Sequence, residues 1–192
     1  MLTILRPAAV LLGLFTLLTG AVYPLVVTGA ARAIFPAQSR GSLIQEGDRV
    51  IGSTLIGQPF EDPRYFWGRP SATSPRAYDA SASTGSNLGP SNPALADAVR
   101  ARVAALRAAD PDSTAPVPID LVTTSASGLD PHISPAAAMY QVARVARARG
   151  LPEARVRELV DRFTERPTLG LLGEPRVAVL PLNLALDDLN TR

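Results

Sequence analysis

The feature that most restricts the structure of this chain is an uncharged apolar run near its N-terminus. Between Arg6 and Arg32 no residue carries a charge, and most residues there are aliphatic. A helix of about 20 apolar residues is long enough to cross the hydrocarbon core of a bilayer. The run therefore predicts one transmembrane helix in a cell membrane. The predicted division of the chain is a short tail, a transmembrane helix and a soluble domain, over residues 1–7, 8–31 and 32–192.

A cleavable signal peptide is the alternative interpretation of the same segment. Residues 31–33 (ARA) have the small-x-small form of a cleavage site, and Arg6 supplies a basic start. However, the apolar run is much longer than the ~7–15 residues usual in a signal peptide. A retained membrane anchor is therefore favoured. Its glycines would let a partner helix approach closely, although glycine is also common in membrane helices generally.

The sequence gives only a weak indication of the side of the membrane on which the domain lies. Basic residues near a membrane helix tend to stay in the cytoplasm. The N-terminal flank offers Arg6 and the terminal amine, whereas the C-terminal flank offers Arg32, Arg40 and Arg49. This count slightly favours a cytoplasmic domain and leaves the side open.

Two absent residue types exclude several kinds of chemistry. The chain contains no lysine, which excludes a phosphate-binding GxxxxGK[ST] loop and a Schiff-base nucleophile. It contains no cysteine, which excludes disulfides, thiolate nucleophiles and zinc–thiolate sites. The formal net charge of +2 is too small to indicate a nucleic-acid partner.

The remainder of the chain mixes strand and helix signals without a regular βαβ order, which predicts an α+β domain. β-Branched residues at 48–56 predict a strand or one arm of a hairpin. Asn92 and Ser134, each a capping residue followed by proline, predict helix starts at Pro93 and Pro135. A third helix is predicted to start at Leu151-Pro152, after Gly150 ends the second. Residues 176–186 are interpreted as a closing strand.

Two further segments stand out between the strand and the helices. Three consecutive aromatics, Tyr65 to Trp67, are expected to anchor the core or an interface, with the core favoured. Residues 71–92 consist almost entirely of small and polar residues and prolines, so composition alone predicts a flexible linker. A loop this long inside a domain is usually functional or disordered.

The residues capable of chemistry do not form a recognisable catalytic or metal site. Residues 122–135 hold the only histidine, His132, with Asp130 and several serines. A nucleophilic triad requires convergence in space, and no GxSxG motif is present. One histidine with one carboxylate also falls short of a metal site. The segment is interpreted as a turn leading to a helix capped by Ser134, and Arg144 and Arg147 as complements to the helix dipole.

Several short segments, in order over nearly the whole chain, carry a family resemblance. They are residues 20–24 (GAVYP), 41–44 (GSLI), 52–53 (GS), 55–58 (LIGQ), 65–66 (YF), 68–72 (GRPSA), 85–90 (GSNLGP), 127–135 (SGLDPHISP) and 141–146 (QVARVA). Together they resemble the C subunit of the Kdp-type potassium-transporting P-type ATPase. One departure is Ala178, where the family pattern has asparagine.

The resemblance implies a non-catalytic subunit of a high-affinity, ATP-driven potassium uptake complex in the cell (inner) membrane. Its implied partners are a channel-like potassium-binding subunit, an ATP-hydrolysing P-type subunit and the lipid bilayer. The chain lacks the DKTGT phosphorylation motif of the hydrolysing subunit.

The resemblance also implies two different mechanisms. In the first, the chain is a catalytic chaperone that raises the ATP affinity of the hydrolysing subunit. Gln141 is then the matching residue for nucleotide contact, with Ser127 and Gly128 as the backbone part, and ATP is the implied cofactor. In the second, the domain lies outside the cytoplasm as a structural cap at the potassium entrance, without nucleotide contact. The resemblance favours the extracytoplasmic side, against the arginine count.

Overall fold

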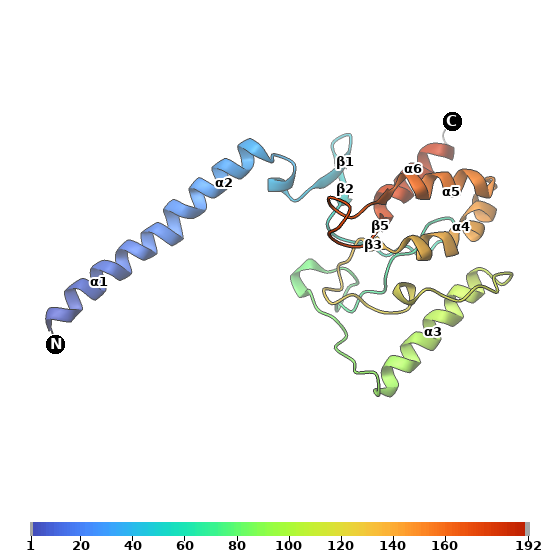
Figure 1. The fold of residues 1–192 in the computed structure, drawn as a ribbon, viewed down its shortest axis with the longest axis horizontal. Coiled ribbons are helices and arrows are strands. Elements are labelled where there is room, and N and C mark those ends of the chain that lie inside the picture. The colour runs from blue at the N-terminus through green and yellow to red at the C-terminus, as the bar shows by residue number, and fades with distance from the viewer. Residues whose placement is uncertain (1, 191–192) are drawn as a thin grey trace. The chain divides into compact units, whose positions relative to one another are not determined.

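The computed structural model describes residues 2–190. They form two compact units, one ending at Ser53 and the other beginning at Thr54 (Figure 1). Each unit is described here by itself.

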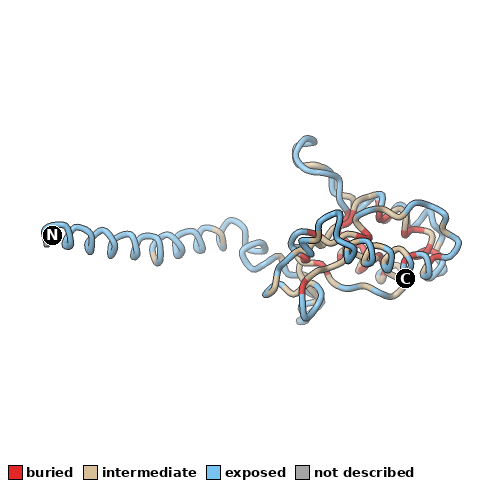
Figure 2. Tube along the Cα trace, turned by 90° about the horizontal axis from the view of Figure 1, so that it is seen from below, coloured by how far each residue is buried: buried red, intermediate tan, exposed pale blue. Residues whose placement is uncertain are grey.

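A long helical run dominates the N-terminal unit. It consists of α1 (Leu2–Leu17), the π-helical turn η1 (Leu18–Val22) and α2 (Tyr23–Ile34). The part from Thr3 to Ile34 has a mean hydropathy of 2.2 and no residue of its most apolar window is buried. Figure 2 shows most of it exposed, with a few positions of intermediate burial and none buried. By length and composition this helix is able to cross a membrane, as the sequence predicts.

The π-helical turn has an identifiable cause in the sequence. Pro24 has no N–H to donate to the carbonyl four residues earlier, and its ring collides with that carbonyl in a regular helix. Immediately before it, the N–H of Tyr23 bonds to the carbonyl of Leu18, five residues back. The extra residue in this turn lets the helix continue past the proline.

The second half of this unit is a short connection followed by a β-hairpin. After a 3₁₀ turn, η2 (Gln38–Arg40), strand β1 (Leu43–Glu46) pairs antiparallel with β2 (Arg49–Ser53). Gly47 makes the reversal at a φ of 58°, which glycine adopts without a steric penalty. The predicted hairpin arm within 48–56 is thus confirmed.

The second unit combines helices with a small sheet. The three-stranded antiparallel sheet has the order β3-β5-β4, so the last strand in the chain lies in the middle. Helices and a sheet in one unit, after an apolar N-terminal helix, confirm the α+β prediction. The elements are η3 (Ala80–Ala82), α3 (Pro93–Ala109), η4 (Ile119–Leu121), β3 (His132–Ile133), α4 (Pro135–Arg149), α5 (Glu153–Arg162), β4 (Thr164–Glu165), β5 (Arg176–Ala178) and α6 (Val179–Asn190).

The predicted helix starts are confirmed, and the caps explain two of them. The side chain of Asn92 accepts a hydrogen bond from the N–H of Ala94, and that of Ser134 accepts one from Ala137. The following proline costs nothing at the first helical position, where its missing N–H would be unpaired anyway. At the other end of α4, Gly150 takes the left-handed conformation that ends many helices.

The core lies where α4, α5, α6 and the sheet meet, and Figure 2 shows its buried positions in red. Phe66, the middle residue of the aromatic triplet, is fully buried in it, which confirms that this triplet anchors the core. Buried aliphatic residues from the three helices complete it, among them Val142, Val145, Val156, Val160, Leu182 and Leu186.

The predicted closing strand over 176–186 is wrong beyond its first three residues. Only Arg176–Ala178 forms a strand, and the chain then continues as helix α6. Val179, Leu182 and Leu186 recur at helical spacing and are all buried against the core. Pro181 does not oppose this, because it lies in the first turn of the helix, where backbone N–H groups have no intrahelical partner.

Candidate functional site

The residue that the family resemblance assigns to nucleotide contact, Gln141, lies in the interior of the domain. It belongs to α4, and its side chain is 1% exposed. Its Oε1 accepts a hydrogen bond from the N–H of Trp67 at 2.8 Å, and its Nε2 donates to the Trp67 carbonyl at 3.1 Å. Nε2 also donates to the carbonyl of Ala137 at 3.2 Å. The amide therefore bonds to the backbone of Trp67 as a neighbouring β-strand would.

A second amide does the same for the preceding residue. Asn183 of α6 is 2% exposed, accepts from the N–H of Phe66 at 2.9 Å and donates to its carbonyl at 3.0 Å. The segment around Phe66 has no sheet partner, so these two side chains satisfy buried backbone groups that would otherwise be costly. Sequence analysis missed Asn183. Its signal was an amide inside an otherwise apolar run.

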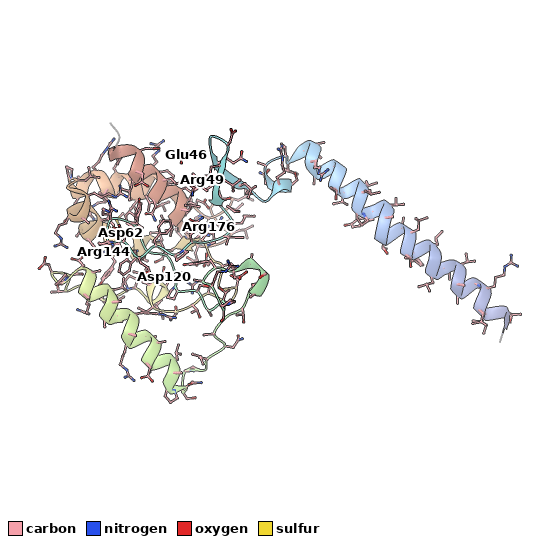
Figure 3. All side chains as sticks on the ribbon, turned by 180° about the vertical axis from the view of Figure 1, so that it is seen from behind. Glu46, Arg49, Asp62, Asp120, Arg144 and Arg176 are labelled. Atoms are coloured by element: carbon pink, nitrogen blue, oxygen red, sulfur yellow. The ribbon has the colours of Figure 1, made fainter. Side chains whose placement is uncertain are left out.

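Two arginines, Arg144 and Arg149, also hold the segment around Phe66 in place. Arg144 is buried, donates to the carbonyls of Pro63 and Tyr65 and to Gln141 Oε1, and lies 4.5 Å above the ring of Trp67. Its place near Asp62 is visible in Figure 3. Arg149 lies 4.7 Å above the Tyr65 ring. Both contacts are cation–π interactions.

The buried Arg144 is unusual because no carboxylate within residues 2–190 bonds to it directly. Burial lowers its pKa to about 10, although Asp110 and Asp62 act in the opposite direction. The charged guanidinium is instead stabilised by hydrogen bonds to carbonyl oxygens and by the face of the tryptophan ring. The sequence-based interpretation of Arg144 as a complement to the helix dipole does not account for this burial. Arg147, by contrast, is exposed and pairs with Asp110 and Asp112.

The other two predicted site residues, Ser127 and Gly128, lie in a loop fixed by hydrogen bonds. The Ser127 carbonyl accepts from the N–H of Thr84 and from Ser83 Oγ, both at 3.0 Å. Gly128 has a φ of 68°, its N–H donates to Ser125 Oγ, and its carbonyl accepts from Ser71 Oγ at 2.7 Å. The loop is therefore joined to the polar segment 71–92.

These bonds change the interpretation of residues 71–92. The segment has little regular structure, but Ser71 Oγ also accepts from the N–H of Tyr78 at 2.9 Å. Thr73 is buried, and its Oγ1 donates to the Arg76 carbonyl and accepts from the N–H of Asp79. Hydroxyl groups thus replace secondary structure in this segment. Composition predicts a flexible linker, but its part up to Thr84 is instead held against the 125–129 loop.

The structure does not join the predicted site residues into one cluster. Among the described residues no hydrogen bond connects Gln141 with Ser127 or Gly128. Gln141 bonds to Trp67, whereas Gly128 bonds to Ser71, four residues further along the same segment. Ser127 is exposed, and its Oγ accepts a hydrogen bond from the N–H of Leu129.

A charged cluster next to this loop was not singled out as a site. Arg69 donates to Asp130 Oδ2 and to the Thr124 carbonyl, both at 3.2 Å. Asp130 Oδ1 accepts from the N–H of His132 at 3.0 Å, and the His132 ring lies 3.4 Å away. Burial opposes ionisation of Asp130, but the bonds from His132 and the charge of Arg69 outweigh it and hold the Asp130 pKa below its usual value.

Replacement of Asp130 by asparagine is expected to lower the free energy of unfolding by about 1 kcal/mol at neutral pH. Because the Asp130 pKa is lower in the folded chain than its ordinary value of 3.8, its ionisation stabilises the folded state above that pH. This contribution is lost as the pH falls through the folded pKa, so stability should decline less steeply below about pH 4 in the variant. Urea titrations of the full chain in detergent, over a pH series, measure the difference.

A matched control for this experiment is Asp97→Asn, since Asp97 forms a solvent-exposed pair with Arg100. Exposed pairs contribute little to stability. Equal pH profiles for the Asp130 variant and the wild-type chain would contradict the prediction.

Comparison with known proteins gives matches over almost the entire chain. The family model described as the K+-transporting ATPase, c chain (KdpC), matches residues 5–188. The potassium-transporting ATPase KdpC subunit of Sorangium cellulosum is 69% identical over 187 residues, covering 97% of this chain and 98% of that protein. The KdpC subunit of Polaromonas naphthalenivorans is 68% identical over 189 residues, covering 98% and 96%. That of Herpetosiphon aurantiacus is 58% identical over 191 residues, covering 100% and 99%.

Proposed function

Because this chain belongs to the KdpC family of K+-transporting ATPase C chains, we propose that it is a non-catalytic accessory subunit required for assembly and activity of a potassium-transporting ATPase. Its relatives are named as subunits of such an ATPase. In this proposal a single apolar helix, Thr3–Ile34, lies in the membrane beside the channel-like potassium-binding subunit and the ATP-hydrolysing subunit. The domain that follows acts as a structural cap outside the cytoplasm.

The observation that supports a cap over direct nucleotide contact is the bonding of Gln141. Both atoms of its amide are used within the domain, by Trp67, Ala137 and Arg144. A ligand could reach this amide only if Trp67 were displaced and the backbone bonds were broken. Contact between ATP and Gln141, Ser127 and Gly128, which would make the chain a catalytic chaperone for ATP binding, stays a prediction.

The membrane side of the domain distinguishes the two mechanisms. The chain contains no cysteine, so Ser86→Cys in the exposed part of the 71–92 segment introduces one thiol. We expect a membrane-impermeant maleimide to label this thiol in intact cells that express the whole complex. Thr3→Cys, at the opposite end of the membrane helix, is the matched control and should be labelled only after lysis.

Labelling of Ser86→Cys only after lysis would contradict the cap, since the domain would then lie in the cytoplasm with ATP.

The accessory role itself has a separate test. When the other subunits are expressed without this chain, the purified complex should lose its potassium-stimulated ATPase activity. Full activity without the chain would contradict the accessory role on either side of the membrane.

A further inference from the structure

The two most exposed large hydrophobic residues of the described chain, Leu169 and Leu171, are not in the apolar helix. They lie in the turn between β4 and β5, residues 168–173, the dark red loop beside β5 in Figure 1. Leu169 is 88% exposed, Leu171 85% and Leu172 64%. The highest value in the apolar helix is 73%, at Leu25. Three exposed leucines within four residues are an apolar patch of the kind that marks an interaction surface.

The turn has a defined backbone conformation. The N–H of Thr168 donates to the Leu172 carbonyl at 2.9 Å, and the N–H of Leu172 donates back to the Thr168 carbonyl at 3.0 Å. The N–H of Gly170 bonds to the carbonyl of Pro167 at 2.9 Å. Leu169 has a φ of 56°, in the left-handed region that is unfavourable for a leucine. The chain thus holds an unfavourable residue in a fixed turn that presents its side chain outward.

The charges around the turn favour a protein over a lipid surface as its binding partner. At its base Glu165 forms an exposed ion pair with Arg176 at 2.8 Å, the latter labelled in Figure 3. Glu174 and Arg166 add one charge of each sign, so the flanks are neutral overall. Loops that insert into anionic bilayers carry excess positive charge and interfacial aromatics. Residues 164–176 have neither.

We propose that this leucine turn docks into an apolar socket on another subunit of the potassium-transporting ATPase. The inference rests on the proposed function, which supplies the partner. A preformed turn loses little conformational entropy when it binds a shaped pocket, whereas a fluid bilayer does not require a fixed shape. Leu169 and Leu171 are the anchors, and the charges of both signs at the base form a polar rim around them.

The first test places an environment-sensitive fluorophore beside the leucines without replacing them. Thr168→Cys is exposed and gives a single labelling site. The labelled full chain is measured in the assembled complex and alone in vesicles of phosphatidylcholine and phosphatidylglycerol. We expect a blue shift of emission only in the complex. A blue shift in vesicles alone would indicate insertion of the turn into lipid, or self-association of the chain if the shift grows with protein density. Either result overturns the proposal. The absence of a blue shift in the complex overturns it as well.

The second test measures how firmly the chain is held. The double variant Leu169→Ser, Leu171→Ser is expected to dissociate from the purified complex about 100-fold faster, because burial of each leucine is worth roughly tenfold or more in the equilibrium constant. Ile119→Ser, at another residue with high exposure, is the control and should dissociate at the wild-type rate. Unchanged emission of Trp67 verifies that the variant domain is folded.

The outcomes separate the docking proposal from the proposed function. If the wild-type chain forms the complex and the double variant dissociates no faster, the docking proposal is overturned while the accessory role stands. If the wild-type chain does not enter the complex at all, the proposed function fails, and the docking proposal falls with it.

Discussion

Replacing Gln141 by methionine is expected to lower the free energy of unfolding of the full chain by about 3 kcal/mol, since buried polar groups that lose their partner cost ~1–3 kcal/mol each. The variant leaves the N–H and carbonyl of Trp67 without their amide partner and removes one acceptor from Arg144. Methionine nearly conserves the volume, so the loss reports the hydrogen bonds more than the packing. Urea titration in detergent, followed by far-UV circular dichroism and by the single tryptophan, measures it.

The control for Gln141 is Ala148→Met, which places the same side chain at an exposed position of the same helix. It should leave stability within about 0.5 kcal/mol of wild type. The Gln141→Met variant also tests the role that the family resemblance assigns to Gln141. If the Gln141 amide contacts ATP, the assembled complex should show a raised KM for ATP with the unfolding free energy unchanged. That result would contradict a purely structural role.

Replacing Gly128 by alanine is expected to cost about 3 kcal/mol of unfolding free energy, from a left-handed backbone and a backbone collision together. A Cβ at Gly128 would lie 2.6 Å from the Thr84 carbonyl oxygen and 2.8 Å from Thr73 Cγ2. The carbonyl cannot retreat easily, because Thr84 is itself bonded to Ser127 through its N–H. The same substitution should loosen the 71–92 segment, measured as faster amide hydrogen exchange there.

Gly89→Ala is the matched control for Gly128, since a Cβ at Gly89 meets nothing within 4 Å and Gly89 does not have a positive φ. It should be neutral or slightly stabilising. If both alanine variants were equally stable, the contact between the 125–129 loop and the 71–92 segment would not exist in solution as described.

Local signals were sufficient for much of the secondary structure. The caps Asn92 and Ser134, each followed by proline, predict two helix starts, because the first turn of a helix is stabilised by its own neighbours in sequence. Residues 176–186 were misassigned because β-branched and apolar residues at a strand–helix junction suit either state. Residues from Val179 onward form a helix because that conformation packs Leu182 and Leu186 against the core.

The candidate site was less accessible to sequence reasoning. Family resemblance selected Gln141, Ser127 and Gly128, but no local pattern shows that Gln141 binds the backbone of a residue 74 positions earlier. Arg144 has the sequence appearance of a surface arginine near a helix end. Its burial depends on Trp67 and on the carbonyls of Pro63 and Tyr65, which reach it only in the folded domain.

The sequence by itself determined the apolar helix, the absence of lysine and cysteine chemistry, the family and the positions of most helices. These follow from composition, from spacing along the chain and from contacts between near neighbours. Only the tertiary structure decided that Gln141 and Asn183 pair with the backbone of Trp67 and Phe66, that hydroxyl groups fix the 71–92 segment, and that leucines project from the β4–β5 turn. Each of these depends on groups distant in sequence, or on the absence of any covering group, and side-chain burial is a property of the assembled fold.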